Sequence, residues 1–337
     1  MPDPGILAAV RGEKAIARRI RQIYGKAQKD ILSTVQGFNL RFMADEKRML
    51  KKLADKVITE QEYKGWLRRT VFRGKQWDAK ANHCAEIMFH ANQEAVKIVR
   101  GHQISVFAEN ATYQAYELEK GARMSFGFGI YSPETVTKLL KEQPELLPRK
   151  VVNGVKDKAW NKNKISNAIT QSIIQGDGIQ GIAENIAETL GLQNDDAMMR
   201  YARTAITAAQ NAGRMEMLHE AEDDGIKVKK KWLASLDNRT RDAHAKLDGQ
   251  TADIDEPFVV DFNGEMVEIM YPGDPSCDEP GMVYNCRCTL VYEVEEYPIE
   301  SQRRAYDEWD DEEGHHRESY LIPGNITYRE WKEMKRH

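Results

Sequence analysis

The sequence is poor in cysteine and has no long apolar run. Its 337 residues include four cysteines, too few for the disulfide framework that stabilises small secreted proteins. No stretch approaches the roughly 18 consecutive apolar residues of a membrane-spanning helix. The N-terminal MPDPGILAAVRGEK also lacks the long apolar core of a signal peptide. We therefore expect a protein that is made and folds in a cytoplasm, without a membrane segment.

Charge is plentiful but unevenly distributed. Charged residues make up 30% of the chain and hydrophobic residues 41%, with a formal net charge of −4. Residues 1–75 contain 18 Lys and Arg against 8 Asp and Glu, so this part carries about +10 and the remainder about −14. Much of the negative charge falls between residues 293 and 318. The basic part suits contact with a polyanion or an acidic protein surface, although two solvated charged faces would give the same composition.

The first third has the apolar periodicity of long helices. Apolar residues recur there at three- and four-residue steps and form one stripe: Ile16, Ile20, Ile23, Ala27 and Ile31. Similar patterns cover residues 45–67 and 77–121, the second with an interruption near Gly101 and a stop at Gly121. These patterns predict an extended, basic helical region over residues 1–120.

Residues 121–150 are rich in glycine and proline, which predicts a linker holding one short helix that starts near Ser132. Helical patterns resume over residues 151–225. They predict two amphipathic helices around a Gly-Asp-Gly turn, the second ending at Gly191, and then a long alanine-rich helix that stops at Gly225.

Beyond residue 225 the apolar period changes from helical to alternating. Asn263-Gly264 joins two alternating stretches and is the strongest short signal for a hairpin. With a charged helix before this hairpin, residues 226–297 predict a small domain in the order β-α-β-β-β. The fold class is therefore mostly α with long N-terminal helices and a small C-terminal α+β domain, followed by an acidic, partly ordered tail at residues 298–337.

The charged helix is predicted between Asp237, a good N-cap, and Gly249, a good residue to follow the C-cap. Four of its residues would share one face: Asp237, Arg241, His244 and Asp248. A hydrolase could use His244 as a general base, but the sequence has neither a serine or cysteine nucleophile in a strained turn nor a glycine-rich phosphate cradle. We favour a structural clasp in which arginines pair with nearby carboxylates. Its predicted members are Asp237, Arg239, Arg241, Asp248, Asn285 and Arg287.

Three of the four cysteines, Cys277, Cys286 and Cys288, lie within twelve residues. A Cys-x-Cys pair before a strand can bind zinc when other ligands complete a tetrahedron, and Cys277 and His244 are the available partners. Two alternatives stay open: buried thiols without a metal, and a disulfide formed after release from the cell. A domain of about 70 residues has a small core and usually needs such a staple. No cofactor other than structural zinc is indicated.

The segment KWLASLDNRTRDAHAKLDGQ, followed by YPGD and NCRCTLVY, resembles the phage Mu F-like family of minor head proteins, also called phage head morphogenesis proteins. The preceding YARTAITAAQNAGRMEMLHEAEDDG is similar too, so the resemblance covers roughly residues 150–297. In many relatives a Cys-x-x-Cys stands where this chain has Arg241 and His244, and a histidine stands at the position of Val283. This chain keeps both cysteines of the Cys-x-Cys pair and one histidine.

The resemblance implies a structural protein and not an enzyme. Such proteins are present in few copies in the heads of tailed phages, where they associate with the portal vertex and assist head assembly. The partners implied are the portal protein and capsid or scaffold proteins, and the location is the virion, in the head interior or at the portal vertex, after assembly in the host cytoplasm. The basic N-terminal region would suit an acidic portal surface or packaged DNA, with a role in packaging or ejection.

Two other classes of function stay open from the residues alone. One is a toxin-type enzyme, a nuclease or ADP-ribosyltransferase, that would use Arg239, Arg241 and His244. The other is a DNA-binding module built on the basic N-terminal helices, which lack the interleaved aromatic residues that single-strand binders use for stacking.

Overall fold

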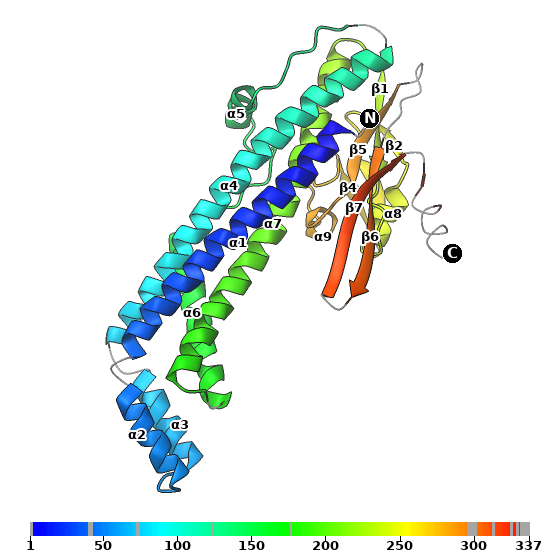
Figure 1. The fold of residues 1–337 in the computed structure, drawn as a ribbon. Helices are drawn as coiled ribbons and strands as arrows, with labels where there is room; N and C mark the ends of the chain where they lie inside the picture. Colours follow the sequence, from blue (N-terminus) through cyan, green and yellow to red (C-terminus); the bar gives the residue numbers. More distant parts are fainter. Residues whose placement is uncertain are drawn as a thin grey trace. The chain divides into compact units, whose positions relative to one another are not determined.

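The computed structural model describes residues 3–39, 43–71, 75–122, 125–175, 177–294, 302–311, 314–323, 326–327 and 330. Most of these residues are helical, and the strands belong to the last third of the chain (Figure 1). The chain divides into two compact units. The helical unit comprises residues 17–98 and 150–199, and the mixed unit comprises residues 1–16, 99–149 and 200–337. None of the described helices is long and apolar enough to cross a membrane.

Among the described residues, six helices contribute to the helical unit. Three of them, α1, α4 and α7, contribute residues to both units. Their bounds are α1 (Pro4–Asn39), α2 (Met43–Ala54), α3 (Glu60–Val71), α4 (Lys75–Ala122), α6 (Gly154–Gln175) and α7 (Ile179–Asp223). The apolar stripe predicted on α1 is buried along its whole length, with Ile16, Ile20 and Ile31 fully inaccessible to solvent. The periodicity therefore identified the core-facing side of this helix correctly.

A row of polar side chains crosses the core of the helical unit. The Tyr24 hydroxyl donates to the Asn92 side-chain oxygen, Asn92 donates to Asn194 at 3.2 Å, and Asn194 donates to Asn161 at 3.1 Å. All four side chains are buried. Burial raises the pKa of Tyr24, which keeps its hydroxyl protonated as a donor. Because a shifted helix would leave these amides unpaired, the network specifies the register of the helices that carry it.

The expected helix ends at two glycines are wrong. Helix α4 runs through Gly101 and α7 runs through Gly191 without interruption. A side-chain carbon at Gly191 would lie 2.5 Å from the Gln28 side chain, so this glycine allows two helices to pack closely. Gly101 has open space around it and is tolerated at the usual cost of about 1 kcal/mol.

Two local elements of the mixed unit, a short helix and a hairpin, form where the sequence predicts them. Helix α5 (Pro133–Glu142) starts at the N-cap Ser132, whose hydroxyl accepts from the Thr135 backbone N–H. Strands β3 (Phe258–Phe262) and β4 (Glu265–Ile269) form the predicted hairpin. At its turn, Asn263 and Gly264 both have positive φ, 56° and 92°, as the type I′ loop of a two-residue hairpin requires.

The mixed unit also contains a three-stranded antiparallel sheet with the strand order β2-β1-β5. Its strands are β1 (Val228–Leu233), β2 (Thr251–Asp253) and β5 (Thr289–Val294), with α8 (Asp242–Leu247) and α9 (Pro280–Val283) in the connections. The short strand β2 and helix α9 are additions to the predicted β-α-β-β-β order. Both are too short to show a periodicity in the sequence.

The acidic tail contains a hairpin of β6 (Gln302–Asp311) and β7 (Gly314–Pro323). The prediction of partial order did not include these strands, because the dense charge obscures their alternation. Ala305 is fully buried against Leu236, and the Tyr306 backbone N–H donates to the Leu236 carbonyl at 3.1 Å. These contacts join the described part of the tail to the segment that follows β1.

Polar side chains of α7 bond to the backbone of β5 and the residues before it. Thr207 donates to the Cys286 carbonyl at 2.6 Å, and Asn211 donates to the Cys288 carbonyl at 3.1 Å. Asn211 also accepts from the Leu290 N–H at 2.8 Å. The helix thus satisfies backbone groups that a further strand would otherwise pair. At Gly213 a side-chain carbon would lie 2.4 Å from the Phe107 carbonyl, so α7 and α4 touch backbone to backbone there.

Lys230, in the middle of β1, has a fully buried side chain. Its ammonium group donates to the Ile254 carbonyl at 2.9 Å and lies 5.4 Å from the centre of the Phe258 ring. Burial lowers the pKa of this lysine to about 8, and the negative charges of Asp255, Asp274 and Glu256 offset only part of that effect.

This buried amine predicts a pH dependence of stability. Between pH 8 and 10.5 the unfolded chain binds a proton at Lys230 that the folded chain has released, so the free energy of unfolding should rise with pH in this window. Urea denaturation at several pH values would measure the slope. Lys230→Met should reduce the slope, while Lys229→Met, at an exposed neighbour, should keep it. Equal slopes in the wild type and Lys230→Met would contradict the assignment.

Candidate metal centre

The candidate site lies in the mixed unit, between the segment after β1 and the segment before β5. The predicted helix from Asp237 is shorter than expected: α8 starts at Asp242 with Arg241 as its N-cap, and it ends before Gly249, whose positive φ is as predicted. Asp237 accepts instead from the Arg239 backbone N–H at 2.9 Å and the Thr240 hydroxyl at 3.0 Å. These bonds close a turn, so the expected stripe from Asp237 to Asp248 does not form on one helix.

Asp237 also forms the central ion pair of the site. Its carboxylate lies 2.7 Å from the Arg287 guanidinium and is almost completely buried. The same guanidinium lies 5.5 Å from the centre of the Tyr306 ring. The Cys-x-Cys segment therefore supplies the cationic partner of Asp237. Arg241, expected to pair with a carboxylate, donates to the Tyr284 backbone carbonyl.

Two other predicted clasp residues, Asp248 and Asn285, take part in hydrogen bonds that involve backbone N–H groups. Asp248 accepts from the Ala234 N–H at 2.9 Å, which fixes the return of the chain from α8 to the end of β1. The Asn285 N–H donates to the Thr204 hydroxyl of α7 at 3.0 Å, and Asn285 itself has a positive φ of 55°. The structure thus joins the turn, α8 and the Cys-x-Cys segment, partly through partners other than those expected.

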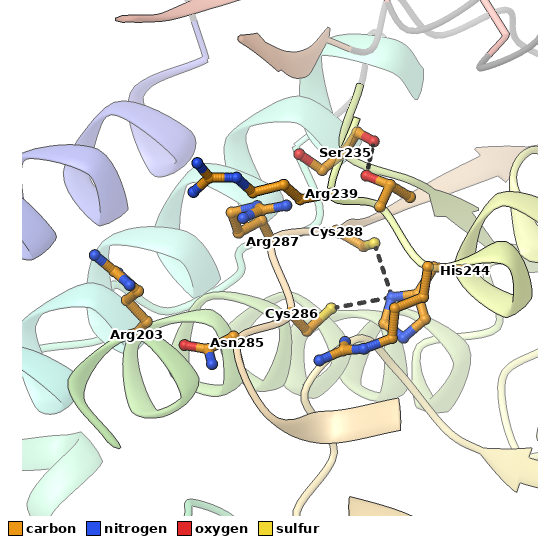
Figure 2. Close-up of a pocket in the computed structure, with 10 residues that line it drawn as sticks. Arg203, Ser235, Arg239, His244, Asn285, Cys286, Arg287 and Cys288 are labelled. Atoms are coloured by element: carbon orange, nitrogen blue, oxygen red, sulfur yellow. Dashed lines mark hydrogen bonds between the residues drawn. The ribbon is translucent and has the colours of Figure 1, made fainter. Parts of the chain in front are cut away.

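His244, Cys286 and Cys288 converge on one point. The Nδ1 atom of His244 lies 3.3 Å from the Cys288 sulfur and 3.6 Å from the Cys286 sulfur. Figure 2 shows both sulfurs directed at the same ring nitrogen. All three side chains are 2% exposed, so the cluster is part of the core of this unit.

Cys277 lies outside this cluster. Its thiol is half-buried and donates to the Glu279 carbonyl at 3.8 Å. It is therefore not a fourth ligand in this structure, although the sequence places it among the predicted four.

The three donor atoms could hold a metal ion, since all lie within 4.8 Å of one another. A tetrahedral zinc ion with bonds of about 2.0 Å to nitrogen and 2.3 Å to sulfur separates those two atoms by about 3.5 Å. The observed distances between His244 and the two sulfurs, 3.3 and 3.6 Å, are close to this value. The donor types, imidazole and thiol, are those that zinc prefers.

The two thiols differ in acidity. Burial raises the pKa of both, but the Cys288 thiol donates to the Cys286 sulfur, and Arg241 and Arg287 lie near that sulfur. The pKa of Cys286 is therefore lowered, while burial and the same hydrogen bond hold the pKa of Cys288 well above its ordinary value. Cys286 is the first of the two to reach the thiolate form that binds metals.

The surroundings hold the cluster in place. The His244 ring packs edge-on against Trp232, with ring centres 5.6 Å apart, and Trp232 packs against Phe258. Thr207 and Asn211 of α7 fix the backbone on either side of Arg287 through the Cys286 and Cys288 carbonyls.

Sequence reasoning missed this contribution of α7. The signal was present as polar residues spaced by three and four within an alanine-rich helix: Thr204, Thr207, Asn211 and Arg214. All four are buried, so this polar face marks a surface that bonds to other backbone and not to water.

The comparisons with known proteins agree with the motif at this site. Residues 163–291 match the family model described as phage Mu protein F like protein. Over this segment, which includes His244, Cys286 and Cys288, the chain is similar to phage Mu F-like proteins. The predicted resemblance over residues 150–297 is confirmed by this match.

Three individual relatives are similar to the chain over different shares of their length. The minor head protein GP7 of Bacillus phage SPP1 is 28% identical over 239 residues, covering 68% of this chain and 69% of that protein. The NAD(+)--arginine ADP-ribosyltransferase EFV of Enterococcus faecalis is 32% identical over 155 residues, but this match covers only 30% of the enzyme. The uncharacterized protein YqbB of Bacillus subtilis is 28% identical over 159 residues, or 49% of its length. No solved structure matches the chain.

Proposed function

We propose that this protein is a minor head protein of a tailed bacteriophage that acts in head morphogenesis. The observation that supports this most is the match to GP7, because it extends over two thirds of both chains and beyond the Mu F-like segment. The long helices and the small mixed sheet suit a structural part of a particle.

We place the protein at the portal vertex, with the portal protein and capsid or scaffold proteins as partners. It would join the head in the host cytoplasm and stay in the virion. The basic charge of residues 1–75 suits an acidic partner surface or packaged DNA, which connects the protein with packaging or ejection.

The main alternative is a toxin-type enzyme, and the ADP-ribosyltransferase relative is the observation that favours it. The geometry around His244 supports a structural role instead. Its Nδ1 atom is directed at two thiols, and its ring is buried against Trp232. A general base needs a substrate proton within hydrogen-bond reach. The thiols contact Nδ1, and Nε2 is buried in a side chain that is only 2% exposed. We therefore propose that His244, Arg239 and Arg241 have no catalytic role.

The cluster of His244, Cys286 and Cys288 is proposed as a structural zinc site. When bound, zinc would cross-link α8 to the segment before β5. The chain supplies three ligands, and the fourth position would be open to solvent or to a small ligand in the adjoining cavity. Unlike the clasp of charged residues, such a cross-link would contribute directly to the folding free energy of the unit.

The proposed function predicts the protein in particles of the phage that encodes it. Mass spectrometry of purified virions should find it at low copy number relative to the major capsid protein. In lysates of infected cells it should co-purify with the portal protein. Absence from both mature virions and precursor heads would contradict the proposal. Particles from a phage with an early stop codon in the gene provide the control for contamination.

A further inference from the structure

A cavity of about 230 Å³ lies beside the thiol cluster, within the mixed unit. Figure 2 shows most of the side chains that surround it. The lining contains four arginines from three parts of the chain: Arg203 of α7, Arg239 and Arg241 of the turn before α8, and Arg287 of the Cys-x-Cys segment. Among the described residues, no aspartate or glutamate lines this cavity. The described part of the lining is therefore rich in positive charge, and the Arg287 guanidinium also lies against the buried carboxylate of Asp237.

Buried polar atoms in the lining have no protein partner. The Ser235 hydroxyl is 3% exposed and makes no hydrogen bond, and the Nε–H of Arg287 is buried and also unpaired. Buried donors without partners are costly, and native proteins satisfy nearly all of them. Since both belong to residues that line the same small cavity, a single ligand that accepts hydrogen bonds there could satisfy them together.

The size and shape of the cavity restrict the ligand. Its volume is below the range of about 300–1,000 Å³ that holds drug-sized molecules, so a small group fits and an extended one does not. The donors come from α7, from the turn before α8 and from the Cys-x-Cys segment before β5. They therefore do not lie in a single plane. A tetrahedral oxyanion accepts from several directions, and guanidinium groups bind phosphate through paired N–H bonds.

The amide of Asn285 also lines the cavity, and its side-chain oxygen is buried without a partner. Rotating this amide by 180° exchanges the oxygen for the NH₂ group, which is a donor. The amide can therefore add a further donor to an anion without any movement of the backbone.

We propose that the arginine-lined cavity is a binding site for a tetrahedral oxyanion of the phosphate class, either free phosphate or a phosphate group of nucleic acid. The donors of this site come from Ser235, Arg203, Arg239 and Arg287, which are separate from the three candidate metal ligands that line the same cavity. It also extends the proposed function, since a head protein with such a site could respond to phosphate or to a nucleic-acid end.

Calorimetric titration of the full chain with inorganic phosphate tests the proposal, with ionic strength held constant by sodium chloride. The wild type should bind phosphate saturably. Arg203→Gln should bind it roughly tenfold or more weakly, because one charged hydrogen bond is lost. Arg200→Gln is the matched control: it removes the same charge from the same helix, one turn away, at a residue outside the cavity lining. Arg203 is exposed, so its replacement should not disturb folding.

Three results would overturn the proposal: no saturable binding by the wild type, equal affinities in the Arg203 and Arg200 variants, or acetate binding as tightly as phosphate. Competition with short DNA strands then assigns the source of the phosphate. Displacement of phosphate only by a 5′-phosphorylated strand assigns the site to a nucleic-acid end. Displacement by unphosphorylated strands as well assigns it to internal phosphodiesters, and displacement by neither assigns it to the free anion.

Discussion

Removal of zinc should lower the melting temperature of the mixed unit more than any substitution discussed here that leaves zinc bound. Structural zinc contributes about 10–16 kcal/mol of apparent binding free energy in zinc-finger peptides near pH 7. That range is an upper limit for this site, which has three protein ligands and a sheet that supports them. Purified protein should contain close to one zinc per chain by elemental analysis. Thermal unfolding followed by circular dichroism, with and without a strong chelator, would measure the effect.

The cysteines of this chain supply matched controls. Cys286→Ser and Cys288→Ser should each abolish zinc binding and reproduce the effect of the chelator, and so should His244→Ala. Cys277→Ser should retain zinc and stability, because that thiol lies outside the cluster and donates to the Glu279 carbonyl. Cys84→Ser, in the helical unit, should also retain zinc.

A metal-free protein whose melting temperature is unchanged by chelators would contradict the zinc proposal. In that case the cluster is held by hydrogen bonds between His244 and the thiols and by packing against Trp232. Cys286→Ser would then destabilise the unit only by the modest amount expected for replacing one small buried thiol.

The sequence was sufficient to predict the parts of the fold that depend on local signals. The apolar stripe of α1, the Ser132 cap and the Asn263-Gly264 turn each depend on neighbouring residues alone. His244 and the Cys-x-Cys pair were predicted to meet because a domain of about 70 residues usually needs a staple, and these side chains could form one. Their convergence is as predicted in the structure, while binding of a metal stays a prediction.

The predictions that were wrong depended on sequence patterns that are compatible with more than one local structure. An aspartate such as Asp237 can cap a helix or close a turn with the same side-chain oxygen. The structure has the turn, and there Asp237 also pairs with Arg287, which lies fifty residues later in the chain. Cys277 was grouped with the other cysteines by its position in the sequence, but the direction of its thiol is set by a loop rich in proline and acidic residues. No local pattern contains either piece of information.

Replacement of Arg214 by methionine is expected to destabilise the mixed unit by about 3–5 kcal/mol, the usual cost of removing one partner of a buried ion pair. The Arg214 guanidinium lies 2.7 Å from the Asp3 carboxylate, and both side chains are more than nine-tenths buried. It also donates to the Asn110 side chain at 3.0 Å and the Leu290 carbonyl at 3.2 Å. A single side chain thus connects the start of α1, helix α4 and strand β5. Urea denaturation would measure the loss, with Arg200→Met as an exposed control on the same helix.

A double-mutant cycle separates the ion pair from the other bonds of Arg214. Asp3→Asn removes the charge but keeps an oxygen that can accept from the Ile6 N–H, which Asp3 now caps at 3.0 Å. If the pair is coupled as its burial implies, Asp3→Asn combined with Arg214→Met should cost less than the sum of the two single changes, because no unpaired charge is left in the core. Additive losses would show that Arg214 acts mainly through Asn110 and Leu290. Arg214 would then stabilise the unit mainly by donating to a backbone carbonyl, as Thr207 and Asn211 do on the same face of α7.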